Sequence, residues 1–128
     1  MRLFLVRHAH SDPGEPDELR PLSARGRVEA RDVGERLAGV EPEFVVSSPL
    51  LRARETAAAI AEAAGSPLRI DERLAPGATA DDLLAVVEGA EASVVVVGHQ
   101  PDCSEIAVAL SGRDPGFPTA GVAELDVS

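Results

Sequence analysis

Four side chains that suit phosphoryl chemistry occur in three segments that lie far apart in the sequence: Arg7 with His8, Arg52, and His99. A neutral imidazole is a competent nucleophile toward phosphorus, and it divides one difficult displacement into two easier ones. Two guanidinium groups can bind non-bridging oxygens in forked geometry and stabilise the charge that builds up in the transition state. The pattern predicts a site in which His8 attacks phosphorus while Arg7, Arg52 and His99 hold the phosphoryl group.

The same grouping predicts the protonation states of the two histidines. Neighbouring cations lower the pKa of a histidine from its usual value of about 6.5, so we expect His8 to be neutral and nucleophilic near pH 7. His99 is expected to donate a hydrogen bond to the phosphoryl oxygens, as an imidazolium once a phosphate dianion is bound. Gln100 follows His99 and joins the predicted phosphate-binding set. This scheme requires no metal ion and no other cofactor.

Strands that alternate with helices are expected to position these residues. Apolar runs without alternation are typical of strands that are buried on both faces of a parallel sheet. Apolar positions at helical spacing predict four helices, which begin after Ser23, after Ser48 and Pro49, at Thr79 and after Pro101. The predicted strands are 3–6, 44–46, 68–70 and 94–97, and the alternating segment 122–127 predicts a strand at the sheet edge. The predicted fold class is a three-layer α/β/α sandwich around a mostly parallel central sheet with an antiparallel edge strand.

This architecture would bring the four residues to one edge of the sheet. In open α/β sheets, ligands bind beyond the carboxyl ends of the strands. His8 follows strand 3–6, His99 follows strand 94–97, and Arg52 lies in the first turn of the helix after strand 44–46. Helix N-termini at this edge add free N–H groups and positive dipole ends. We therefore expect a locally positive site in a chain whose net charge is −10.

Composition limits the classes to which the chain can belong. Its 128 residues match the usual size of one domain, about 100–150 residues, so residues 1–128 are expected to form a single domain. The 22 acidic residues outnumber the 12 basic ones, and Trp and Tyr are absent, which argues against nucleic acid or an anionic membrane as partner. The single cysteine excludes an internal disulfide. No apolar run suits a signal peptide or approaches the roughly 20 residues of a membrane span, so we expect a soluble, cytoplasmic protein.

Other residues have simpler interpretations. Cys103 lies on the apolar stripe of its helix and is interpreted as a core residue. His10 is interpreted as an exposed loop residue. A metal hydrolase built on His8, His10 and His99 is a competing hypothesis, but His8 and His10 would point to opposite sides of an extended segment. A phosphate-binding module without catalysis is another alternative, although recognition alone would not need the nucleophile.

The segments that carry the four residues resemble the signatures of the histidine phosphatase superfamily, which includes the phosphoglycerate mutases. Arg7-His8-Ala9 is similar to its Arg-His-Gly signature, segment 47–56 to its second-arginine segment, and segment 98–101 to its second-histidine segment. Segment 20–26 and the short length look most like the SixA-type phosphohistidine phosphatases. The resemblance implies a phosphohistidine intermediate on His8 in a pocket formed by Arg7, Arg52 and His99.

Two features depart from the family pattern. Ala9 stands where the family has glycine, which matters only if the backbone there needs a positive φ or a close approach. The segment 72–77 has no carboxylate where larger members carry a proton donor, and Asp12, Asp81 or Asp82 are open alternatives. The proline-rich, acidic segment 13–21 reads as a surface loop, which would either close over a ligand or frame the pocket.

The missing proton donor bears on the substrate. An alkoxide is a poor leaving group and needs a proton in the transition state, whereas the imidazole of a phosphohistidine leaves more easily. We therefore predict a phosphatase that acts on phosphohistidine in a protein. A general small-molecule phosphomonoesterase with the same site is the alternative, and the expected partner is accordingly a phosphorylated protein or a small phosphorylated substrate.

Overall fold

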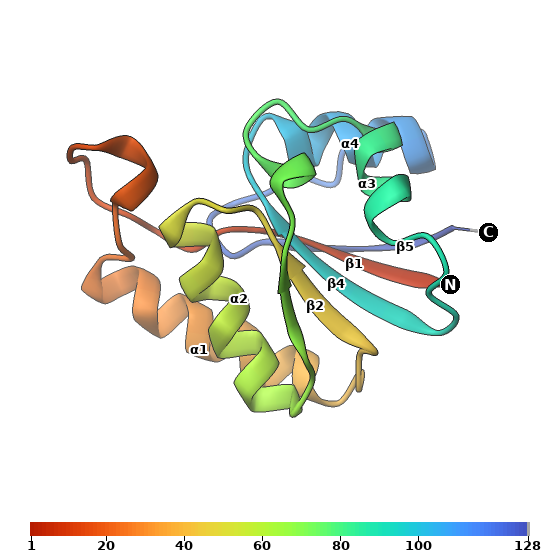
Figure 1. Cartoon of the computed structure of the whole chain (residues 1–128), viewed down its shortest axis with the longest axis horizontal. Coiled ribbons are helices and arrows are strands. Elements are labelled where there is room, and N and C mark those ends of the chain that lie inside the picture. Colours follow the sequence, from red (N-terminus) through yellow and green to blue (C-terminus); the bar gives the residue numbers. More distant parts are fainter. Residues whose placement is uncertain (128) are drawn as a thin grey trace.

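The computed structural model describes residues 1–127 and has a five-stranded sheet with helices on both faces (Figure 1). The strand order is β3-β2-β4-β1-β5, and all neighbours are parallel except β1 and β5, which are antiparallel. In chain order the elements are β1 (Arg2–Arg7), η1 (Asp17–Leu19), α1 (Ala24–Ala38), β2 (Phe44–Ser47), α2 (Leu51–Ala64), β3 (Leu68–Ile70), η2 (Glu72–Leu74), α3 (Ala80–Val86), β4 (Ser93–Gly98), α4 (Asp102–Ser111) and β5 (Val122–Asp126). The predicted fold class is confirmed, including the antiparallel edge strand.

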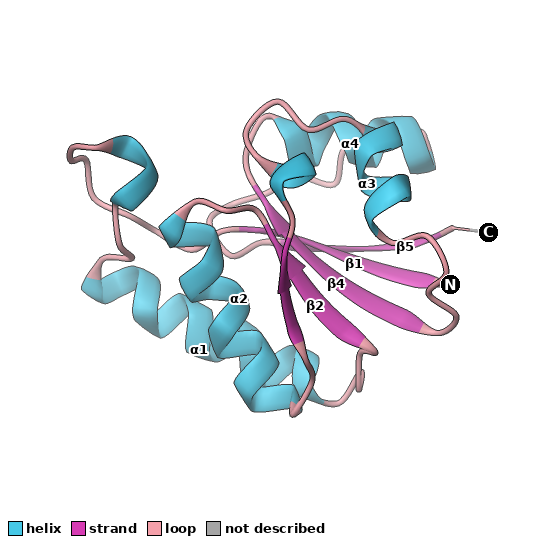
Figure 2. Ribbon diagram, viewed as in Figure 1, coloured by secondary structure: helices cyan, strands magenta, loops and turns pink. Residues whose placement is uncertain are grey.

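The apolar strands have two buried faces because each face carries a helix pair (Figure 2). Val94 and Val96 of β4 belong to the core layer that contains residues of α3 and α4. Val95 and Val97 belong to the layer that contains residues of α1 and α2. Burial on both faces is why β4 lacks the polar alternation of a half-solvated strand. No helix within residues 1–127 combines the length and the apolar character needed to cross a bilayer.

Helix termini follow the predicted signals with one exception. The Ser23 side chain accepts from Gly26 N and caps α1, and Thr79 forms a capping box with Asp82 at α3. The expectation that Ser48 caps the second helix, with Pro49 in its first turn, is wrong. Helix α2 begins at Leu51, and its N-cap position has no side-chain hydrogen bond. The reason is a tertiary contact, because the Ser48 hydroxyl is hydrogen-bonded to the ring of His99.

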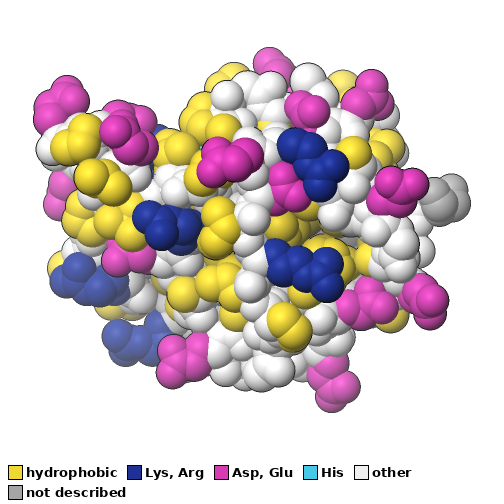
Figure 3. Space-filling model, viewed as in Figure 1, with side chains coloured by type: hydrophobic (Ala, Val, Ile, Leu, Met, Phe, Trp, Pro, Cys, Tyr) yellow, Lys and Arg dark blue, Asp and Glu magenta, His cyan; other side chains and the backbone are white. Residues whose placement is uncertain are grey.

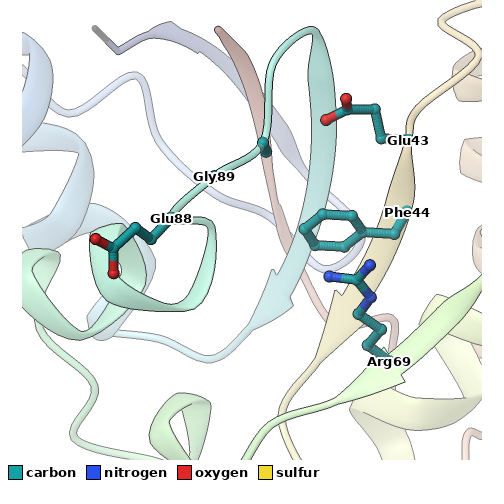
Figure 4. Close-up of a pocket in the computed structure, with 6 residues that line it drawn as sticks. Glu43, Phe44, Arg69, Glu88 and Gly89 are labelled. Atoms are coloured by element: carbon teal, nitrogen blue, oxygen red, sulfur yellow. The ribbon is translucent and has the colours of Figure 1, made fainter.

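The edge strand β3 is held by a stacked cation. The Arg69 guanidinium lies 3.8 Å from the centroid of the Phe44 ring in β2, and Figure 4 shows the guanidinium next to that ring. Phe44 itself is buried, so Arg69 covers the outer side of this core residue. Leu68 and Ile70 are exposed, as is every residue of this three-residue edge strand.

A glycine brings the segment after β1 close to helix α1. An added Cβ at Gly26 would lie 1.9 Å from the carbonyl oxygen of His10, far inside van der Waals contact. The same His10 carbonyl accepts from the backbone N–H of Ser23. Residue 26 must therefore be glycine if the chain that follows His8 is to rest on the start of α1.

We predict that Gly26→Ala lowers the free energy of unfolding by about 1–3 kcal/mol, because the backbone at His10 has to move. Urea unfolding measures the effect. Gly39→Ala is the matched control, since nothing lies within 4 Å of a Cβ at that position. Equal stabilities of the two variants would contradict the close approach at Gly26.

Candidate active site

The predicted site residues gather at the carboxyl ends of β1 and β4. Arg7 is the last residue of β1 and pairs with Gly98, the last residue of β4. The backbone N–H of His8 donates to the Gly98 carbonyl at 3.0 Å, so the chain stays paired as it leaves the sheet. The His8 and His99 ring centroids are 5.3 Å apart. Parallel pairing thus brings two histidines that are 91 positions apart in sequence into one site.

One ring nitrogen of His8 is hydrogen-bonded to the backbone. Nδ1 lies 2.7 Å from the carbonyl oxygen of Ala9, which can only accept, so Nδ1 carries the proton. The lone pair of the neutral ring therefore resides on Nε2. Ala9 is not among the positive-φ residues of the described chain, so alanine replaces the family's glycine without backbone strain.

Burial keeps both imidazoles neutral. Desolvation, followed by the charges of Arg52, Arg7 and Arg20, lowers the pKa of His8 to about 4 against the opposing hydrogen bond to Ala9. Desolvation, followed by His8 and Arg52, lowers the pKa of His99 to about 4. The sequence predicted that the pKa of His8 is lowered, and the structure agrees. Burial lowers this pKa more than the neighbouring cations do.

Both arginines are anchored by backbone carbonyls. Arg7 donates from Nη1 to Phe117 O at 2.9 Å, and Arg52 donates from Nη1 to Asp17 O at 2.9 Å. Arg52 also donates from Nη2 to the Asp17 carboxylate at 3.3 Å. Each guanidinium is thus held through Nη1, whereas its Nε is buried and has no hydrogen-bond partner.

Three buried side-chain nitrogens of the predicted site have no protein partner. The unpartnered buried side-chain nitrogens of the described residues are Arg7 Nε, Arg52 Nε, Arg54 Nε and His99 Nδ1. Buried polar groups in folded proteins are nearly always hydrogen-bonded, and an unmet one costs about 1–3 kcal/mol. Three of these four nitrogens belong to residues near His8, because the charges of Arg7 and Arg52 act on it and the His99 ring lies 5.3 Å away.

Within the described chain, the remaining predicted candidates form no side-chain hydrogen bond with these four residues. The Gln100 amide donates to Ser104 Oγ and accepts from Ser104 N, so it binds the first turns of α4, and its role in phosphate binding stays a prediction. Asp82 serves the capping box of α3. Asp12 and Asp81 are exposed and share no side-chain hydrogen bond with the four residues.

Sequence reasoning missed three residues that support the site. Ser48 Oγ lies 2.6 Å from His99 Nε2, and Thr56 Oγ1 accepts from Ala9 N while it donates to Arg52 O. Asp17 binds Arg52 from the segment 13–21. Ser48 and Thr56 stand within the second-arginine segment, which could have drawn attention to them, whereas no local signal marks Asp17.

The side chains of His10 and Cys103 contact parts of the protein outside the predicted site. His10 Nδ1 lies 2.7 Å from Ser23 Oγ at the start of α1. Within residues 1–127 no cluster of three or more His, Cys, Asp and Glu side chains is arranged to hold a metal ion. Cys103 is 1% exposed, as predicted for a core residue, and burial raises the pKa of its thiol to about 12.

The chain belongs to the histidine phosphatase superfamily (branch 1), whose sequence profile matches residues 3–76. Within that superfamily it is SixA-like. The protein histidine phosphatase SixA complexed with tungstate superposes over all of this chain and 89% of its own, with a TM-score of 0.90 and 28% identity. The SixA of Agrobacterium tumefaciens covers 98% of this chain and 90% of its own, with a TM-score of 0.82 and 30% identity. The predicted family resemblance is confirmed.

Curated relatives are also found by sequence. An uncharacterised Picosynechococcus protein is 37% identical over 127 residues, which covers 91% of this chain and 76% of the relative. A probable phosphoglycerate mutase GpmB of Salmonella paratyphi C is 35% identical over 81 residues, which covers 58% of this chain and 37% of the relative. Family membership thus rests on sequence and on fold.

We predict that stability falls with pH below neutrality in a way that depends on His8. Between pH 6.5 and about 4 the unfolded chain binds a proton at this histidine that the folded protein does not, so the free energy of unfolding decreases as the pH falls. His8→Asn removes this linkage, and the variant should lose less stability than the wild type between pH 8 and pH 5. Urea unfolding at both pH values measures the difference, with pH 8 as the baseline because His8 is then neutral in both states. Parallel losses in the two proteins would show that His8 titrates normally when folded.

Proposed function

We propose that the protein is a metal-independent phosphatase that forms a covalent phosphohistidine intermediate on His8. The observation that carries the proposal is the set of buried, unpartnered side-chain nitrogens on Arg7, Arg52 and His99 around this histidine. The phosphohistidine phosphatases among its structural relatives support the same class.

The reaction proceeds in two displacements. In the first, the lone pair of His8 Nε2 forms a bond to phosphorus, and the bond from phosphorus to the leaving group breaks with its electron pair on that group. In the second, a water oxygen attacks phosphorus, the N–P bond breaks, and the electron pair returns to Nε2 while the water proton passes to solvent. The Ala9 carbonyl holds the proton on Nδ1 throughout, which keeps the reacting nitrogen defined.

Arg7, Arg52 and His99 stabilise the charge on the phosphoryl oxygens. The Nε edges of both guanidiniums suit forked contacts with two oxygens. The His99 pKa of about 4 makes its ring neutral in the free protein, so a bound dianion has to raise that pKa before the ring carries two protons. Ser48 at Nε2 fixes the orientation of the ring in either state.

We infer that the substrate is phosphohistidine in a protein. Within the described chain, Asp12, Asp81 and Asp82 form no side-chain hydrogen bond with the four residues, so none of the three is held by the site next to a leaving alkoxide. An imidazole leaves with less need for such a proton. The tungstate-bound relative SixA is a protein histidine phosphatase, which agrees with this choice.

A small-molecule phosphomonoester is the second candidate substrate. It is favoured by the sequence similarity to a probable phosphoglycerate mutase over 81 residues. The same four residues would serve, and only the leaving group would differ.

The test measures phosphate release from a phosphohistidine protein and from p-nitrophenyl phosphate, both in EDTA. We predict rapid release from phosphohistidine, and His8→Ala should abolish it by roughly a thousand-fold or more because the nucleophile is lost. His10→Ala is the matched control, since the His10 ring binds Ser23 instead of the site, and it should retain most of the activity.

Each other outcome leads to a different conclusion. Faster turnover of the ester would favour the phosphomonoesterase. Loss of activity in EDTA would contradict the metal-independent mechanism. Phosphate binding without release of phosphate from either substrate would make the protein a binding module.

A further inference from the structure

Asp17 is the only acidic residue within the described chain whose side chain forms an ion pair with a predicted site residue. Its carboxylate oxygen Oδ2 lies 3.3 Å from Arg52 Nη2, and its carbonyl oxygen accepts from Arg52 Nη1 at 2.9 Å. The two contacts occupy the Nη1 and Nη2 ends of the guanidinium, which leaves Nε and the second N–H of Nη2 for a phosphoryl oxygen. Asp17 and the ligand thus share one cation.

A second arginine holds the same carboxylate. Arg20 Nε lies 3.0 Å from Asp17 Oδ1, and Arg20 Nη1 donates to the carbonyl of Asp12 across the loop. Asp17 is 61% exposed, whereas the Arg52 side chain is only 8% exposed. The carboxylate therefore lies between the solvent and the buried guanidinium.

The loop around Asp17 is acidic on its outer surface. Asp12, Glu15 and Glu18 are all exposed, and no lysine or arginine other than Arg20 occurs between positions 9 and 24. Figure 1 shows this orange-red loop projecting beside the starts of α1 and α2, and Figure 3 shows acidic side chains gathered at that end of the molecule. Negative charge thus borders the positively charged residues of the site.

We propose that Asp17 is an affinity-setting residue: a fixed counter-ion on Arg52 that weakens the binding of phosphate dianions and so promotes release of the inorganic phosphate product. This inference rests on the proposed function, since it concerns the pocket of that reaction. Arg52 needs a full positive charge to stabilise the transition state, but the same charge would retain the product. The Asp17 carboxylate repels the dianion at every stage and limits how tightly free phosphate is held.

A role of Asp17 as the missing proton donor agrees less well with these contacts. The charge of Arg52 is the largest influence on the carboxyl and holds the pKa of Asp17 below its usual value. The group is therefore ionised near neutral pH and has no proton to donate. Its two arginine partners suit a counter-ion instead.

Asp17→Asn separates charge from geometry. Asparagine can still accept from Arg52 Nη2, and the backbone carbonyl of residue 17 still accepts from Nη1, so the guanidinium keeps its anchor while the negative charge is gone. The matched control is Glu18→Gln, which removes the same charge from the next residue. Glu18 is exposed and shares no side-chain hydrogen bond or ion pair with the other residues of the described chain.

The experiment titrates inorganic phosphate at pH 8 into the wild type and both variants by calorimetry, with competitive inhibition of p-nitrophenyl phosphate turnover as a second readout. We expect the Kd of phosphate to fall on the order of five-fold in Asp17→Asn and less than two-fold in Glu18→Gln, as for the loss of one partly exposed charge pair. The difference between wild type and Asp17→Asn should shrink in high salt, since the carboxylate is exposed and its field is screened.

Three results would overturn the inference. Equal tightening in both variants would show a general effect of net charge. Weaker phosphate binding in Asp17→Asn would mean that the carboxylate orients Arg52 instead of opposing the ligand. A lower kcat for the ester in Asp17→Asn at unchanged phosphate affinity would identify Asp17 as a proton-transfer group. None of these results bears on hydrolysis by the wild type, which tests the proposed function separately.

Discussion

The parallel pairing of β1 with β4 is the constraint on which the candidate site depends. Residues 2–7 align with residues 93–98 without a bulge, and the His8 N–H extends the ladder to Gly98. The register is fixed by burial, because both faces of these strands pack into core layers. A slip by one residue would exchange the two faces and separate the histidines. The chemistry at the edge is therefore specified by the hydrophobic core below it.

Buried polar groups without hydrogen-bond partners occur at this edge of the sheet. Arg52 and His99 are 7% and 4% exposed, and buried groups of this kind are stable only when they are paired or neutral. The low pKa values of the two histidines make their rings neutral near pH 7. Each of the two arginines donates from Nη1 to a backbone carbonyl. What is left is a set of buried side-chain nitrogens that no group of the described chain satisfies. Leaving such groups unpaired costs free energy of folding at this edge of the sheet.

The sequence predicted those features that depend on local pattern. Strand 94–97 was recognisable because four valines without alternation require two covered faces, and Arg7, His8 and His99 follow directly from the ends of their strands. The prediction for Ser48 was wrong because a serine before a helix can cap that helix or bind a side chain from another segment. Here its hydroxyl lies against His99, which is distant in the sequence. Asp17 was not predicted, since its contact with Arg52 spans 35 positions and forms through an irregular loop. The amide of Gln100 is hydrogen-bonded to Ser104, and its predicted role in phosphate binding remains a prediction.

The hydroxyl of Thr56 joins the two sides of the site into one unit. It accepts from the backbone of Ala9, beside the nucleophile, and donates to the backbone of Arg52 in the same helix. Thr56 is fully buried, so this link does not compete with water. The spacing between His8 and Arg52 is consequently a property of the scaffold, and a relative that acquires a new substrate has little freedom to alter it. Divergence in specificity within such a fold is then expected in the loop after β1, which can change in length and charge while the distance between nucleophile and guanidinium stays the same.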